Sequence, residues 1–276
     1  MRYTEKLSAR IAATGSNLCI GLDPRPELIE GNVRDFLLRI VAETAGFAAC
    51  FKPNIAYFEA TGSAGIALFE EIRSAIPSEI PVLLDAKRSD IGETQRYYAK
   101  AFFDTWDVDA VTLNPFLGFD SIEPFLDYAG RGLYLLAVTS NPGAADIEMQ
   151  RLADGRQVFE LVQDIARRAA GREADVGFVL GLTNAAADVL SKIDDLPLLV
   201  PGLGAQGGDV HALAASERQA PLLINVSRGI LYPPAGQTPA GAAAAYAAQI
   251  RAALLRQDLC VIPPRGGFPC TGNPSL

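Results

Sequence analysis

The sequence is poor in the residues that bind transition metals or form nucleophile–base pairs. It has one histidine, His211, and four cysteines, none of which forms a C-x-x-C pair. Zinc sites draw on clusters of cysteine and histidine, and a Ser-His-Asp triad needs a histidine beside its serine. We therefore expect no metal site and no hydrolase of the triad type, and we expect His211 to be a surface residue.

Long apolar runs, a secretory leader and an excess of basic residues are also missing. No run approaches the ~20 apolar residues of a membrane span, and residues 1–7 are charged rather than apolar. The net charge of −8 argues against a general nucleic-acid surface. We expect a cytoplasmic protein without membrane or nucleic-acid partners, in which Cys19 and Cys50 are buried free thiols.

Strand and helix patterns alternate along the chain. Its 276 residues are 49% hydrophobic and 20% charged, so it can bury a large core. Eight strands are expected, at 18–23, 47–52, 81–85, 110–114, 133–138, 176–180, 197–200 and 222–226. Eight βα units predict an α/β fold, a closed (β/α)8 barrel or TIM barrel. An open doubly wound sheet is the alternative, but residues 21–26 lack its G-x-G-x-x-G phosphate loop.

A single domain is expected, because no linker divides the chain. We place the barrel domain at residues 1–259, with an extra helix over 2–14 and an alanine-rich helix over 239–256. Residues 260–276 are rich in proline and glycine, so we expect an irregular tail there.

Charged residues gather at the end of the third expected strand. Asp85 and Lys87 are two residues apart, so both would point to the same face of a strand, and Asp90 follows in the loop. Lys52 ends the second strand. The carboxyl ends of barrel strands hold the active site, and buried charges must pair or do chemistry. The cluster is therefore either an ion-pair network at the barrel mouth or a catalytic site.

The order of charges favours one kind of chemistry. A lysine between two carboxylates stays protonated, because a nearby opposite charge favours the charged form. A protonated lysine beside an apolar pocket can donate a proton to a carbanion and stabilise it. A Schiff-base lysine must be neutral, so the cluster disfavours an imine-forming aldolase.

Two further strand ends indicate a phosphate site. Residues 201–208 after the seventh strand are rich in glycine, so backbone N–H groups there can approach a ligand closely. Arg228 follows the eighth strand and can make a charge-assisted contact to phosphate oxygens. Because many barrels bind phosphate between these two loops, we expect a small phosphorylated metabolite as ligand.

The stretch 85–94, Asp-Ala-Lys-Arg-Ser-Asp-Ile-Gly-Glu-Thr, resembles the signature of the orotidine 5'-phosphate decarboxylase family. Its residues are most similar to the motif of the longer, second subfamily. Other motifs of that family follow the same order along the chain. They are Gly-Leu-Asp-Pro at 21–24, Phe-Lys-Pro-Asn at 51–54, Thr-Ser-Asn-Pro at 139–142, the glycine-rich residues 201–208 and Asn-Val-Ser-Arg at 225–228. One departure is Ser89, where glycine is usual in that subfamily.

The resemblance implies a barrel that converts orotidine 5'-monophosphate to uridine 5'-monophosphate and CO2 without a metal or cofactor, the last step of pyrimidine nucleotide synthesis. It implies that Lys87 protonates C6 as CO2 leaves, that Asp85 lies against the substrate carboxylate, and that Lys52 and Asp90 complete the charged array. The implied binding residues are Asp23, Lys52, Asp90 and Thr94 at the ribose, Ser140 at the pyrimidine, Gln206 between base and phosphate, Arg228 with the backbone of Gly207, Gly208 and Gly229 at the phosphate, and Asn54 as a further contact.

The family shares each site between the two subunits of a dimer. The resemblance therefore implies a homodimer in which Asp90 and Thr94 serve the partner's site, and a loop, 201–209, that closes over the phosphate. Two alternatives stay open. A magnesium-dependent sugar-phosphate enzyme of the same superfamily would also carry an Asp-x-Lys pair but would need a further acidic ligand. A catalytically silent nucleotide-binding protein would have no need of Lys87.

Overall fold

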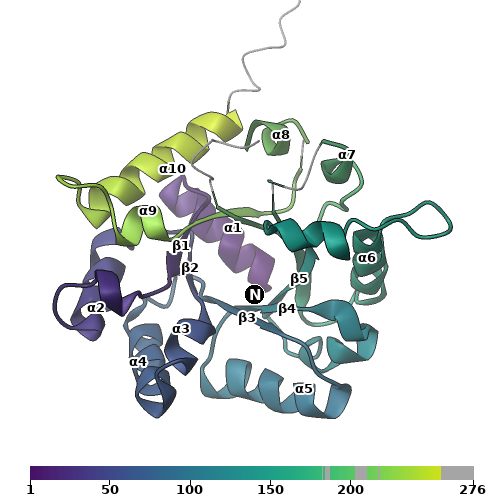
Figure 1. Ribbon diagram of the computed structural model, residues 1–276, viewed down its shortest axis with the longest axis horizontal. Helices are drawn as coiled ribbons and strands as arrows, with labels where there is room; N and C mark the ends of the chain where they lie inside the picture. Colours follow the sequence, from purple (N-terminus) through teal and green to yellow (C-terminus); the bar gives the residue numbers. More distant parts are fainter. Residues whose placement is uncertain (182, 184–186, 203–209, 217, 256–276) are drawn as a thin grey trace, which may run out of the picture.

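The computed structural model describes residues 1–181, 183, 187–202, 210–216 and 218–255. Their eight strands are all parallel. The strands are β1 Leu18–Leu22, β2 Cys50–Pro53, β3 Leu83–Arg88, β4 Ala110–Leu113, β5 Gly132–Val138, β6 Asp175–Leu180, β7 Leu198–Pro201 and β8 Leu222–Val226. Helices and helical turns separate them, and Figure 1 shows the helices arranged around the central strands.

The helical elements are α1 Tyr3–Thr14, η1 Pro26–Leu28, α2 Val33–Thr44, α3 Ile55–Glu59, α4 Gly62–Ala75, α5 Gly92–Ala99, η2 Lys100–Thr105, η3 Pro115–Leu117, η4 Phe119–Ser121, η5 Glu123–Phe125, η6 Pro142–Asp146, α6 Val158–Arg168, α7 Ala187–Leu190, α8 Val210–Ala214, α9 Arg228–Leu231 and α10 Pro239–Leu255. The expected flanking helices over 2–14 and 239–256 correspond to α1 and α10.

The sheet curls into a nearly closed barrel. Its hydrogen-bonded order is β2-β1-β8-β7-β6-β5-β4-β3, so β2 and β3 are the two ends. Two isolated parallel bridges, Phe51 to Val82 and Asn54 to Asp85, bring these ends together, and the Phe51 N–H donates to the Pro81 carbonyl at 3.0 Å. The predicted TIM barrel is therefore confirmed, and the open doubly wound sheet is wrong.

Strand alternation divides the apolar residues into two cores. Successive strand residues point to opposite faces. On β1, Leu18, Ile20 and Leu22 join the larger core between strands and helices, whereas Cys19 joins a smaller one inside the barrel. The smaller core also holds Tyr134, and α1 contributes Tyr3 to it. Cys19 and Cys50 are buried free thiols, as expected.

Helix α1 covers the amino-terminal end of the barrel strands. The Tyr3 hydroxyl lies 3.2 Å from that of Tyr134, and the Lys6 ammonium donates to Asp109 at 2.5 Å. The backbone N–H of Val82, just before β3, also donates to Asp109, at 2.8 Å. This packing leaves the opposite, carboxyl-terminal end for the site, where the predicted residues lie.

Two strand boundaries differ from the sequence prediction by three residues, and the other boundaries differ by at most two. The second strand begins at Cys50 rather than at residue 47, because the N–H groups of Phe47 and Ala48 bond back to Thr44 and Ala45 in a turn. The third strand continues beyond residue 85 to Arg88. This extension includes Lys87, which the sequence pattern placed beside Asp85 at the carboxyl end of the strand.

Candidate functional site

Two lysines and one aspartate form a charged network at the carboxyl end of β2 and β3. The Lys52 ammonium donates to Asp85 Oδ2 at 2.9 Å, and the Lys87 ammonium donates to Asp85 Oδ1. The Lys52 and Asp85 side chains are only 5% and 10% exposed, whereas that of Lys87 is 46% exposed. One carboxylate is therefore clamped between a buried cation and a cation that reaches the mouth of the barrel.

Electrostatics keep the buried pair charged. Burial alone would lower the pKa of Lys52, but the charges of Asp85 and Asp23 outweigh it and raise that pKa above its usual range. Burial likewise acts to raise the pKa of Asp85, yet the charges of Lys52 and Lys87 and their hydrogen bonds hold it well below its usual range. Both groups are charged at neutral pH.

A buried hydroxyl on the neighbouring strand completes this network. Thr112 Oγ1 on β4 donates to Asp85 Oδ1 at 2.9 Å. Sequence reasoning missed this residue. The available signal was a lone polar side chain in the apolar strand Ala-Val-Thr-Leu, next to the strand that carries Asp85.

Asparagines at two strand ends cap the next helical turn. The side-chain oxygen of Asn54 accepts the N–H of Ala56 at 3.1 Å, and that of Asn114 accepts the N–H of Phe116 at 3.1 Å. Such contacts satisfy backbone N–H groups at the start of a helix, which have no acceptor within the helix itself. The oxygen of Asn54 is thus engaged in capping, and its backbone pairs with Asp85 in the bridge between β2 and β3.

A cavity of about 470 Å³ opens at the ends of β1, β7 and β8, and Asp23, Asn225, Ser227, Arg228 and Gly229 are among the residues that line it. Three of these lining residues carry a buried polar atom without a hydrogen-bond partner among the described residues: Asp23 Oδ1, Asn225 Oδ1 and Ser227 Oγ. Buried polar atoms are rarely left unpaired, and exceptions gather at functional sites. The two acceptor oxygens, of Asp23 and Asn225, suit a ligand that carries hydrogen-bond donors, and the Arg228 guanidinium suits an anionic group on the same ligand.

Gly21 allows the two walls of this cavity to meet. A Cβ at this position would lie 2.7 Å from the Ser227 Cβ and 3.2 Å from Asp23 Oδ2. Since real Cβ atoms essentially never approach so closely, a side chain here would push β1 away from the loop after β8.

Ser140 lies exposed at the end of β5 and is positioned through its neighbours. The Glu148 carboxylate accepts the Thr139 N–H at 2.6 Å and the Thr139 hydroxyl at 2.9 Å. On the other side, a Cβ at Gly181 would lie 2.5 Å from the Ser140 nitrogen. Glu148 is, after Thr112, a second residue near the predicted site that the motifs did not indicate.

The remaining predicted residues are not brought into the network among the described residues. Within the described chain, the Asp90 carboxylate accepts one hydrogen bond, from the Ile91 N–H at 2.8 Å. Thr94 lies on α5, in the first turns after that loop. Gln206, Gly207 and Gly208 lie outside the described residues, as do the loop 203–209 and the predicted tail 260–276. Ser89 is described, and its backbone avoids the left-handed region, so the serine causes no strain there.

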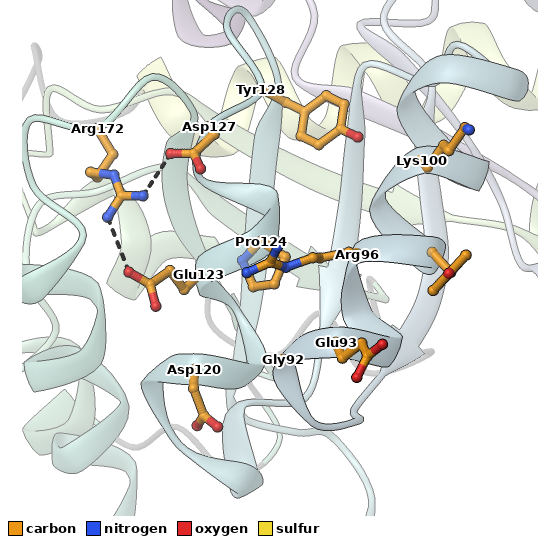
Figure 2. Close-up of a pocket in the computed structure, with 11 residues that line it drawn as sticks. Gly92, Glu93, Arg96, Lys100, Asp120, Glu123, Pro124, Asp127, Tyr128 and Arg172 are labelled. Atoms are coloured by element: carbon orange, nitrogen blue, oxygen red, sulfur yellow. Dashed lines mark hydrogen bonds and ion pairs between the residues drawn. The ribbon is translucent and has the colours of Figure 1, made fainter.

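A larger cavity, about 1,100 Å³, lies elsewhere, between α5 and the turns η4 and η5 (Figure 2). Its charged side chains are of both signs, and Arg172 pairs with Asp127 at 2.6 Å and with Glu123 at 3.5 Å. Among described residues, none of the buried unpaired polar atoms lines it. Size alone therefore does not identify the site.

Two features are absent from the described residues. They contain no group of three or more histidine, cysteine, aspartate or glutamate side chains arranged to hold a metal ion. No helix among them has the length and apolar character needed to cross a membrane.

Together, the fold and the site define a TIM-barrel enzyme with a lysine–aspartate network beside an anion cavity. Residues 16–246 match the pattern of the Orotidine 5'-phosphate decarboxylase / HUMPS family. The orotidine 5'-phosphate decarboxylases of Verminephrobacter eiseniae and Roseiflexus castenholzii are 45% and 41% identical, each over 92% of this chain and 98% and 97% of their own. The structure of Leishmania donovani OMP decarboxylase is similar, with a TM-score of 0.80 and 34% identity over 92% of this chain and 99% of that one. The chain belongs to the orotidine 5'-phosphate decarboxylase / HUMPS family.

Proposed function

We propose that this protein decarboxylates orotidine 5'-monophosphate to uridine 5'-monophosphate and CO2 without a cofactor, as the last step of UMP synthesis in the cytoplasm. The observation that carries the proposal is the Asp85 carboxylate held between Lys52 and Lys87 at the barrel mouth. Family membership and the names of the relatives support it, since the two bacterial relatives are both called orotidine 5'-phosphate decarboxylase.

Lys87 is the proton donor in this proposal. As the bond between C6 and the carboxylate breaks, its electron pair stays on C6 and CO2 leaves. The Lys87 ammonium transfers a proton to C6 and regains one from water, which its half-exposed side chain can reach. The ammonium also stabilises the negative charge that develops on C6.

Asp85 orients this donor and faces the substrate carboxylate. Its hydrogen bond to Lys87 directs the ammonium, and Lys52 keeps Asp85 ionised. A second negative charge beside the substrate carboxylate disfavours the bound ground state relative to the transition state, from which CO2 departs uncharged.

Binding of the nucleotide involves both ends of the site. In the proposal Arg228 and the Gly229 backbone hold the phosphate in the cavity at β8. The resemblance assigns Gln206, Gly207 and Gly208, which lie outside the described residues, to the same phosphate. Asp23 and Lys52 contact the ribose, and Ser140 contacts the pyrimidine. Asn54 is a further contact through its side-chain NH2 group, because its side-chain oxygen caps the following helix. Remote binding of the phosphate can then support chemistry at C6.

The protein acts as a homodimer in this proposal, with Asp90 and Thr94 completing the partner's site. Among the described residues, the Asp90 carboxylate accepts a hydrogen bond from the Ile91 N–H and none from Lys52 or Lys87 of its own subunit. The apolar side chains of Ile91, Phe116 and Leu117, which follow the neighbouring strands β3 and β4, are exposed. Exposed apolar side chains close together mark interaction surfaces.

Phe116→Asp should therefore yield monomers in analytical ultracentrifugation, and an unchanged dimer, or a wild-type monomer, would contradict the assignment.

The decisive experiment follows the absorbance of orotidine 5'-monophosphate in the presence of the purified protein. We expect turnover that excess EDTA does not reduce.

Lys87→Ala should lower kcat by several orders of magnitude while the fold is retained, because the proton donor is lost. Lys100→Ala, a change of another exposed lysine outside the site, is the matched control. Absence of turnover by the wild-type protein would overturn the proposed function, and near-normal turnover by Lys87→Ala would overturn the role of Lys87.

A further inference from the structure

The Thr112 hydroxyl uses its full hydrogen-bonding capacity at the base of the charged network. It donates to Asp85 Oδ1 at 2.9 Å and accepts the backbone N–H groups of Ala86 and Lys87, each at 3.0 Å. A hydroxyl has one donor and two acceptor positions, and here all three are occupied. The side chain is fully buried on β4, so water does not compete for these bonds.

These bonds coincide with an irregularity in the barrel. Leu84 of β3 pairs with Val111 of β4, and Arg88 pairs with Leu113, so β3 advances four residues where β4 advances two. Such a bulge leaves backbone groups without ladder partners. Thr112 lies inside this interval, and its hydroxyl accepts two of the N–H groups that the ladder cannot use.

The same bulge places Lys87 in an unusual conformation. Its φ is +48°, in the left-handed region, and only one other described non-glycine residue, Asp107, shares a positive φ. A residue with a Cβ adopts this region at an energetic cost and keeps it only where the surroundings impose it. The hydrogen bond from the Lys87 N–H to Thr112 is one such constraint.

We infer that Thr112 is a positioning residue for this site. Its hydroxyl fixes both the left-handed backbone conformation of Lys87 and the orientation of the Asp85 carboxylate. One oxygen atom thus contacts both the residue that is to donate the proton and the carboxylate that directs it. The catalytic part of this inference rests on the proposed decarboxylation, whereas its geometric part does not.

Substitutions at Thr112 separate the hydroxyl from the shape of the side chain. Thr112→Val keeps the branched shape but removes all three hydrogen bonds, and Thr112→Ser keeps the hydroxyl and loses a methyl group. Thr44→Val is the matched control, because Thr44 is also fully buried and its hydroxyl donates to the Ile40 carbonyl at 2.6 Å, within α2 and away from the site.

We expect Thr112→Val to lower kcat by about 10- to 100-fold, the loss typical of a reacting group displaced by about 1 Å. Binding of UMP, measured by calorimetry, should change less than about twofold, because the phosphate is bound at the other side of the barrel. Thr112→Ser should recover most of the loss, and Thr44→Val should leave kcat unchanged. A kcat of Thr112→Val within twofold of wild type, or equal losses in the valine and serine variants, would overturn the inference.

Two further measurements keep the outcome decisive. If Thr112→Val does not fold, Thr112→Cys replaces it and is compared with Thr112→Ser, because the two side chains differ only in their terminal atom and the thiol, although larger than the hydroxyl, is a weak donor and acceptor. Turnover equal to that of Thr112→Ser would then overturn the inference. If the wild-type protein does not decarboxylate the nucleotide, the proposed function fails, and a crystal structure of Thr112→Val tests the geometric part. Lys87 should leave the left-handed region in that structure, and an unchanged Lys87 and Asp85 would overturn it.

Discussion

Replacing Asp85 with asparagine would leave two lysines without the carboxylate they share while retaining the shape of the side chain. The Lys52 side chain is 5% exposed and its ammonium lies 2.9 Å from Asp85 Oδ2. Removing one partner of a buried ion pair costs about 3–5 kcal/mol, because the other charge stays buried. Asp23 still attracts Lys52 and offsets part of this cost. Lys87 is hydrated and adds less than about 1 kcal/mol.

Asp85→Asn should therefore lower the free energy of unfolding by about 3–4 kcal/mol, near the lower end of that range. For a chain of this size the corresponding decrease in Tm is roughly 6–8 °C. Urea denaturation followed by circular dichroism, together with calorimetry, would measure both quantities. Turnover should fall as well, since the carboxylate that directs Lys87 is gone.

Asp107→Asn is the matched control for this substitution. Asp107 also pairs with two cations, Arg73 at 2.9 Å and Arg131 at 2.7 Å, but its side chain is 66% exposed. Exposed ion pairs contribute about 0–1 kcal/mol, so this variant should lie within about 1 kcal/mol of wild type. If Asp85→Asn and Asp107→Asn destabilise the protein equally, burial does not set the strength of the network and the reasoning is refuted.

Three other predictions concern the anion cavity, its walls and pH. Arg228→Ala should lower kcat/KM for the nucleotide by roughly 10- to 100-fold, as expected for a lost charged hydrogen bond, with little effect on the dephosphorylated nucleoside; equal losses for both would contradict a phosphate contact. Gly21→Ala should cost about 1–3 kcal/mol from overpacking, measured by urea denaturation, whereas Gly46→Ala, with no atom within 4 Å of its added Cβ, should cost far less. The folded pKa of Asp85 is lowered, so its contribution to stability is present above its unfolded pKa and lost as pH falls through the folded value. That of Lys52 is raised, so its contribution is present below its unfolded pKa and lost as pH rises through the folded value. The difference in unfolding free energy between wild type and Asp85→Asn should thus be constant between about pH 5 and 9 and shrink below about pH 4, and a steady decline across the neutral range would contradict the pairing.

The sequence placed Lys52, Asp85 and Lys87 together for a reason that is only partly correct. Strand alternation predicts that residues two apart share a face, and the Lys87 ammonium does bond to Asp85. Yet β3 is not regular there, because Lys87 lies in a bulge with a left-handed backbone. The neighbourhood was predictable from spacing, but the conformation depends on a hydroxyl from another strand, which spacing along one segment does not reveal.

For other residues too, spacing along the sequence predicted some features, and contacts with distant parts of the chain decided the rest. Asp23 and Arg228 could be assigned to one end of the barrel from their position after apolar runs, and both line the same cavity. The contacts of Glu148 with Thr139 could not, because they join residues nine apart through an irregular loop without periodicity. The beginning of β2 was also placed too early, since the apolar residue Phe47 suits a strand and a turn equally well.

The sequence by itself determined the barrel, its eight strands and the charged residues at their carboxyl ends, because apolar periodicity and the alternation of strand and helix are local properties of the chain. The tertiary structure alone decided which oxygen of Asp85 each lysine contacts, that Thr112 holds the bulge, and that three polar atoms face one cavity without a partner. These features depend on distances between side chains of different strands. They are set only when barrel closure fixes the register of one strand against the next.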